Sequence, residues 1–201
     1  METKNITQEE SLSIIQQMIT AAKKDQKDDG LGWIYWGWML FAASVFTFLN
    51  LQFKWANTFF FWNAFGMVAL CLMAYSTLKQ WFFSKTVKVK TYMGELFQKL
   101  NIGFFICVMF VITAINTGVP PSKGFPLLIN LYGFWILIYG TALNFKPSII
   151  GAYITWVFGF ISLFVKNFEM VMVLHALAIL AGYIIPGHMA YSSFKKQQII
   201  H

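Results

Sequence analysis

Four side chains could form a polar binding site within an otherwise apolar chain: Asn63, Asn116, Asn130 and His175. Amides and a neutral imidazole both donate and accept hydrogen bonds, which suits a small neutral or amphipathic molecule. Each residue stands near one end of a different apolar run. At about 1.5 Å rise per residue, Asn63, Asn130 and His175 lie roughly 7–10 Å below the same membrane surface, with Asn116 in that layer or just above it. The sequence therefore predicts an outward-facing polar chamber, provided that these helix faces converge.

The same residues have a simpler interpretation as interhelical hydrogen bonds. In a membrane bundle such bonds contribute about 0.6 kcal/mol each on average, and a bundle of this size needs some polar side chains to set the helix register. Asn130 and His175 lie on stripes of small residues and are expected to point inward, whereas the direction of Asn63 is open. The structure has to distinguish a binding chamber from hydrogen bonds that only hold the helices together.

Catalytic and ion-coupling groups are scarce. The sequence has no His-Glu-x-x-His zinc motif, no Gly-x-Ser-x-Gly nucleophile elbow, no Cys-x-x-Cys and no glycine-rich phosphate loop. Outside the N-terminal arm the only carboxylates are Glu95 and Glu169, both at membrane edges, so no acidic pair stands at mid-membrane for proton or sodium coupling. We therefore expect no enzymatic activity, because an embedded enzyme would have to be built on His175 alone.

No metal or cofactor is expected either. Methionine, cysteine and histidine are ligands for copper, but the ten methionines are scattered without ligand spacing and suit packing better. Cys71 and Cys107 fall inside apolar runs, which implies no disulfide framework. All fifteen basic residues are lysines. Without the planar guanidinium of arginine, binding of nucleotides and nucleic acids is disfavoured.

The elements that must position these residues are six apolar runs of roughly membrane-spanning length. About 20 apolar residues cross a hydrocarbon layer of about 30 Å, and charged residues make up only 11% of the chain. The predicted fold class is therefore all-α: a polytopic membrane protein with six transmembrane helices in a domain 31–191, followed by a cytoplasmic tail 192–201. The predicted spans are approximately 33–51, 59–78, 102–117, 127–143, 149–165 and 170–189. The chain has the general character of small six-span bacterial membrane proteins, and no motif assigns it to a family.

Lysine placement predicts the orientation of these spans. Alternating the spans between two sides puts twelve lysines on the side of both termini and three on the other side, namely Lys54, Lys123 and Lys166. Cytoplasmic loops carry the excess of positive charge. We therefore expect both termini in the cytoplasm and a multi-pass protein of the cell inner (plasma) membrane.

Two cytoplasmic segments are candidates for binding a protein partner. Residues 1–30 are predicted to form an amphipathic helix, because Thr7-Gln8-Glu9-Glu10 has capping-box spacing and apolar residues then recur at helical period. This helix could equally lie on the membrane or dock under the bundle. The basic loop 79–99 alternates lysines with apolar residues, as in a segment that rests on anionic headgroups. Beyond the lipid bilayer, the expected partners are a protein at these segments or a second copy of the chain, and no nucleic acid.

Small residues predict which helices pack closely, since helices in lipid approach through small side chains. One such stripe occurs in each of the last three runs: Asn130, Gly133, Leu137, Gly140 and Asn144; Ser148, Gly151, Thr155, Gly159 and Ser162; His175, Ala178, Gly182 and Pro186. These three helices should form the tight core, while the Phe-rich flanks of the first three face lipid or a second protomer. Pro186 should bend the last helix near its inner end.

The functional expectation is a non-enzymatic accessory, sensor or assembly component of the membrane. The alternative is a passive channel or carrier for a small neutral or amphipathic solute, which would use the polar chamber. The absence of recognisable catalytic and coupling groups favours the first function.

Overall fold

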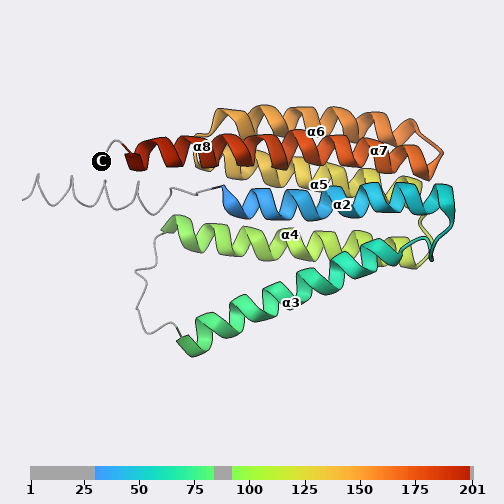
Figure 1. Ribbon diagram of the computed structural model, residues 1–201, viewed down its shortest axis with the longest axis horizontal. Helices are drawn as coiled ribbons and strands as arrows, with labels where there is room; N and C mark the ends of the chain where they lie inside the picture. Colours follow the sequence, from blue (N-terminus) through green and yellow to red (C-terminus); the bar gives the residue numbers. More distant parts are fainter. Residues whose placement is uncertain (1–29, 84–91, 200–201) are drawn as a thin grey trace, which may run out of the picture.

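The computed structural model describes residues 30–83 and 92–199, and every regular element in these two stretches is a helix. The elements are α2 (Leu31–Phe53), α3 (Phe60–Phe83), α4 (Tyr92–Asn116), α5 (Pro121–Ala142), α6 (Lys146–Phe164), α7 (Phe168–Ile179), the π-helical turn η1 (Leu180–Ile184) and α8 (Ile185–Ile199). The last three run on as one long rod, and the helices lie side by side with alternating direction (Figure 1). The α2–α3, α4–α5 and α6–α7 connections share one end of the bundle, called here the α2–α3 end, and the α5–α6 turn lies at the other (Figure 1).

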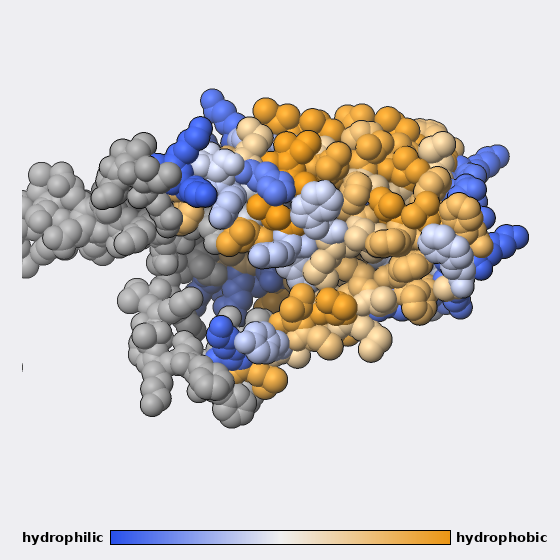
Figure 2. Space-filling model, in the orientation of Figure 1, coloured by the Kyte–Doolittle hydropathy of each residue, from blue (hydrophilic) through white to orange (hydrophobic). Residues whose placement is uncertain are grey.

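Length and composition make this bundle compatible with a membrane. Five helical stretches of the described residues are long and apolar enough to cross one, whereas α3 contributes the shorter apolar stretch Phe60–Leu72. Apolar side chains cover the middle of the molecule and hydrophilic ones gather at both ends (Figure 2). An all-helical, membrane-compatible fold is thus confirmed, while the count of six spans stays a prediction. The predicted amphipathic helix and the middle of the basic loop lie outside the described residues.

The helices next to the basic loop extend beyond the predicted spans. α3 continues to Phe83, and α4 begins at Tyr92 rather than at Ile102. Both ends of the loop predicted over 79–99 are therefore helical. An apolar run marks only the part of a helix that lies in hydrocarbon, and an existing helix propagates readily into polar sequence.

The small-residue stripe of α6 forms the centre of the bundle, as expected. Ser148, Gly151, Thr155, Gly159 and Ser162 are all buried. On the facing rod, His175, Ala178, Gly182 and Pro186 are buried as well. A Cβ added to Gly151 would stand 2.7 Å from the carbonyl oxygen of Ala181, so the two backbones approach as closely as glycine allows.

The tight core predicted for the last three spans also includes α2. Its buried residues repeat every three or four positions, which places them on one face toward α7, η1 and α8: Gly37, Leu40, Ala43, Ser44, Thr47 and Asn50. A Cβ at Gly37 would lie 2.9 Å from side-chain atoms of Tyr183 and Ile184, so α2 approaches the rod by the same small-residue device. Within the described residues the backbone of α3 comes close only to α2, and that of α4 only to α5.

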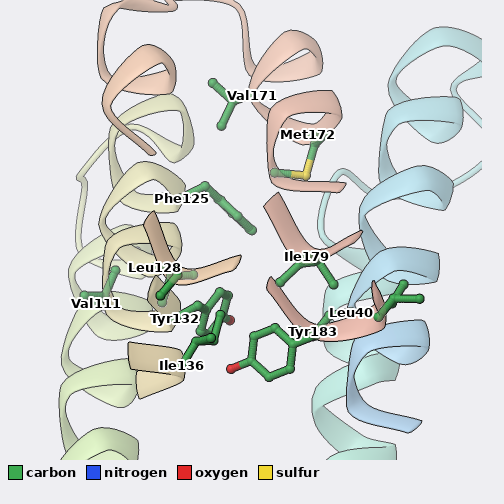
Figure 3. Packing of buried hydrophobic residues seen from close by; sticks show 12 residues of the cluster. Leu40, Val111, Phe125, Leu128, Tyr132, Ile136, Val171, Met172, Ile179 and Tyr183 are labelled. Atoms are coloured by element: carbon green, nitrogen blue, oxygen red, sulfur yellow. The ribbon is translucent and has the colours of Figure 1, made fainter. Parts of the chain in front are cut away.

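Apolar side chains fill the space between α5 and the rod. Phe125, Tyr132 and Ile136 of α5 lie opposite Met172 and Ile179 (Figure 3). Ile136, Met172 and Ile179 are completely buried. These apolar side chains surround the buried polar residues described in the next subsection.

Pro186 changes the helix that contains it. A proline has no N–H to donate to the carbonyl four residues back, and the turn just before it widens, so that the N–H of Ile185 bonds to the carbonyl of Leu180. The hydroxyl of Thr155 on α6 donates to the carbonyl of Gly151 in its own helix at 2.8 Å, and its oxygen also lies 3.2 Å from the carbonyl oxygen of Ala178, just before this turn. A π turn supported from the neighbouring helix therefore accommodates the proline.

We expect Gly151→Ala to destabilise the bundle by about 1–3 kcal/mol, because the new Cβ would meet a backbone oxygen that cannot move aside. The matched control is Gly103→Ala on α4, where an added Cβ meets nothing within 4 Å. Thermal unfolding in detergent should show a lower midpoint for the first variant and an unchanged or higher midpoint for the second. Equal midpoints would contradict close packing at Gly151.

Candidate functional site

His175 is the completely buried polar residue at the centre of the candidate site. It lies in α7, two turns beyond Asn167, whose side chain caps the helix by accepting from the Glu169 N–H at 2.9 Å. The Nδ1 atom of His175 is 2.7 Å from the hydroxyl oxygen of Ser44 on α2. The pair thus links α2 and α7 through the core, a contact that the sequence did not predict.

The hydrogen bonds of Ser44 favour one imidazole tautomer. The Ser44 hydroxyl has a single hydrogen and lies 2.8 Å from the carbonyl oxygen of Leu40, which can only accept. The hydroxyl therefore donates to Leu40 and accepts from Nδ1–H of His175. The groups that contact His175 are this hydroxyl and uncharged rings, so the imidazole is neutral in hydrocarbon. Its other nitrogen, Nε2, is consequently a bare acceptor.

Three aromatic rings surround the imidazole. Trp62 of α3 lies at 5.3 Å between ring centroids, Tyr132 at 5.7 Å and Phe125 at 5.9 Å, all nearly perpendicular to the imidazole plane. Trp62 also contacts Phe125, with centroids 4.9 Å apart. Phe125 and Tyr132 both point from α5 toward the rod (Figure 3). Side chains from three other helices, α2, α3 and α5, therefore contact His175.

Two polar atoms in this group have no hydrogen-bond partner within the described part of the chain. They are the Nε2 atom of His175 and the Nε1 atom of Trp62, and both are buried. One is an acceptor, the other can only donate, and they belong to rings in contact. A buried polar group without a partner costs about 1–3 kcal/mol. This arrangement suits the binding of a small neutral molecule better than nucleophilic catalysis, because the Ser44 proton is held by a carbonyl.

The four predicted chamber residues differ in exposure. The side chains of Asn63, Asn116 and Asn130 are exposed, whereas His175 is fully buried. Asn116 donates to the carbonyl of Ile112 in its own helix at 3.0 Å. The four residues therefore do not form one enclosed cluster, and whether the three amides bind anything stays a prediction.

The expectation that Asn130 points inward is wrong. The indole of Trp156 on α6 packs over Gly133, where an added Cβ would stand 2.5 Å from the ring, and its N–H donates to the Asn130 carbonyl at 3.0 Å. Trp156 thus fills the space beside the stripe. Asn130 lies about 60° round the helix from Gly133 and about 160° from Tyr132, the residue that faces His175. Its side chain is left on the outside.

Sequence reasoning missed Ser44 and Trp62, which complete the group around His175. Ser44 could have been found, because Gly37, Leu40, Ser44 and Thr47 recur at the same spacing as the stripe that was recognised on α6. Trp62 lies near the start of the predicted span 59–78, where a tryptophan is typical of the membrane surface. Nothing in its spacing indicates that the ring turns inward, since that depends on how α3 packs against α2.

Comparison of the chain with protein-family models, with curated proteins and with solved structures finds no match in any of the three.

We expect Ser44→Ala to lower the free energy of unfolding by about 1–3 kcal/mol, because the Nδ1–H of His175 loses its acceptor in the core. The matched control is Thr47→Val, which removes a buried hydroxyl that bonds only to the Ala43 carbonyl of its own helix. In detergent denaturation the double variant Ser44→Ala/His175→Leu should lose less stability than the sum of the single variants. Additive losses would contradict a coupled pair.

Proposed function

We propose that this chain is a non-enzymatic membrane component that assembles, within the bilayer, with a second copy of itself. The observation that carries the proposal is Asn130: its side chain is exposed in the middle of α5 and makes no hydrogen bond within the described residues. An amide that faces hydrocarbon lacks the hydrogen bonds it has in water. Polar side chains of this kind commonly hydrogen-bond across helices.

The surface around Asn130 is apolar and broad enough for a neighbouring helix. Leu127 and Phe134 lie on the same face of α5, and Tyr153 and Phe160 flank Trp156 on α6. All four apolar side chains are between 45% and 65% exposed. We call these residues, with Asn130, the α5–α6 outer face.

A second copy of the chain is the occupant that this surface favours. An asparagine amide carries both donors and acceptors, so two amides related by a twofold axis satisfy each other. A partner of different sequence would need a matching polar residue at the same depth.

The buried hydroxyls of Ser44, Thr47, Thr155 and Ser162 all bond to backbone carbonyls, which supports a structural role for the core polar groups.

The proposed setting is the cell inner (plasma) membrane, with six spans and both termini in the cytoplasm. The α2–α3 end, which carries Lys54, Lys123 and Lys166, would then face outward. A cytoplasmic partner for residues 1–30 and for the basic loop 79–99 belongs to the same proposal, and it rests on sequence alone.

We expect Asn130→Leu to weaken self-association in nanodiscs or mild detergent, with a dissociation constant about 3- to 15-fold higher, because each interhelical hydrogen bond contributes about 0.6–1.7 kcal/mol. Analytical ultracentrifugation of the purified protein measures this directly. The control is Asn116→Leu, since that amide already bonds within its own helix. A protein that is monomeric at all concentrations, or one in which both variants associate unchanged, would refute the proposal.

Orientation is tested with single cysteines at Lys123 and at Lys195, in a background where Cys71 and Cys107 are serine. A membrane-impermeant maleimide applied to intact cells should label Lys123→Cys and leave Lys195→Cys unlabelled until the cells are opened. The reverse pattern would invert the proposed topology.

A second candidate function is passive transport of a small neutral or amphipathic solute. The two buried polar atoms without partners at His175 and Trp62 favour it, because a solute could supply the missing bonds. Flux of such a solute in proteoliposomes, compared with that through the Ser44→Ala protein, separates it from a purely structural role.

A further inference from the structure

The rings of His175 and Trp62 present an acceptor and a donor to the same small region of the core. Nε2 of His175 can only accept in the tautomer that Ser44 imposes, and Nε1–H of Trp62 can only donate. The ring centroids are 5.3 Å apart. The two rings are therefore neighbours in the core, and each carries a buried polar atom without a partner in the described residues.

A hydroxyl group is the chemistry that satisfies both atoms at once. Its oxygen accepts from the indole N–H and its hydrogen is donated to the imidazole. A carbonyl or an ether could accept from Trp62 but would leave Nε2 bare, and an ammonium ion could not accept from the indole. Ions are further disfavoured, because the groups around His175 are uncharged.

The aromatic rings next to His175 favour a hydroxyl that belongs to an aromatic or otherwise apolar molecule. Phe125 and Tyr132 contact the imidazole with their rings, and Phe168 contacts Phe125 at 5.2 Å between centroids. Aromatic pairs add about 0.5–1.5 kcal/mol beyond area burial. Trp62 lies in the first turn of α3 and His175 about 10 Å along α7 from Phe168, so the group is close to the α2–α3 end.

We propose that His175 and Trp62 form a binding site for a neutral hydroxyl group, supplied either by a membrane-dissolved alcohol or phenol or by a water molecule. The inference is independent of self-association at Asn130. It requires Ser44 to hold the imidazole in the tautomer with Nδ1 protonated.

The test uses nitrogen-15 NMR of the whole protein in detergent micelles, with histidine and tryptophan labelled, and His175→Gln to assign the signal. The probe is phenol, and anisole is the control because its oxygen accepts but cannot donate. Phenol should shift the Nε2 signal saturably and anisole should not. Trp62→Phe, which keeps an aromatic ring, should weaken the phenol effect about 3- to 10-fold, as expected for one hydrogen bond. Trp156→Phe should leave it unchanged, since that indole bonds to the Asn130 carbonyl.

The outcomes separate the two sources of the hydroxyl. A response to phenol alone assigns the site to a membrane-dissolved compound. The site is assigned to water if three results occur together. Nε2 is already hydrogen-bonded without phenol, its signal does not shift when phenol is added, and the bond is lost in Trp62→Phe. The inference is overturned by a free Nε2 under all conditions, by a protonated Nε2, or by a scalar coupling across a direct Trp62–His175 hydrogen bond. Where Trp62→Phe fails to fold, the comparison of phenol with anisole on the unaltered protein still decides whether a membrane-dissolved hydroxyl binds, and a free Nε2 without phenol still excludes water.

Discussion

The bilayer core offers no hydrogen-bond partner, and this membrane-compatible bundle bonds its buried hydroxyls internally. The hydroxyls of Ser44, Thr47, Thr155 and Ser162 each donate to a carbonyl oxygen of their own helix, and the Thr155 oxygen also lies 3.2 Å from the carbonyl oxygen of Ala178. Asn50 closes the α2–α3 turn by bonding to the backbone of Ala56 and Asn57. Because these five buried side chains bond to the backbone, the two unpaired atoms at His175 and Trp62 differ from them within the described residues.

The same constraint makes small residues decisive. Helices in lipid gain little from burying apolar surface against each other, so stability depends on close backbone approach. Gly37, Gly151 and Gly182 supply it: each would place a Cβ within 3 Å of the facing helix. Thr155 contributes both to close packing and to hydrogen bonding. It lies against Gly182, and its hydroxyl oxygen is 3.2 Å from the carbonyl oxygen of Ala178, just before the π turn that precedes Pro186.

Asn130 and His175 show that two polar residues of similar predicted depth can have opposite roles. His175 is enclosed by Ser44 and three aromatic rings, so its chemistry is directed inward. Asn130 lies on the exposed face of α5, so its amide is available to a neighbouring helix. We propose a role in ligand binding for His175 and a role in assembly for Asn130, and the two can be tested separately.

The sequence by itself determined the helical, membrane-compatible class and the buried stripe of α6, because both depend on composition and on the 3.6-residue period of a single helix. It also located His175 on a buried face. It could not decide that α2 joins the core, that Trp62 turns toward His175, or that Asn130 faces outward. Periodicity tells which residues share a face but not which neighbour that face meets. Only the packed bundle decides this, since a bulky side chain from a neighbouring helix, such as Trp156, can pack against a stripe of small residues.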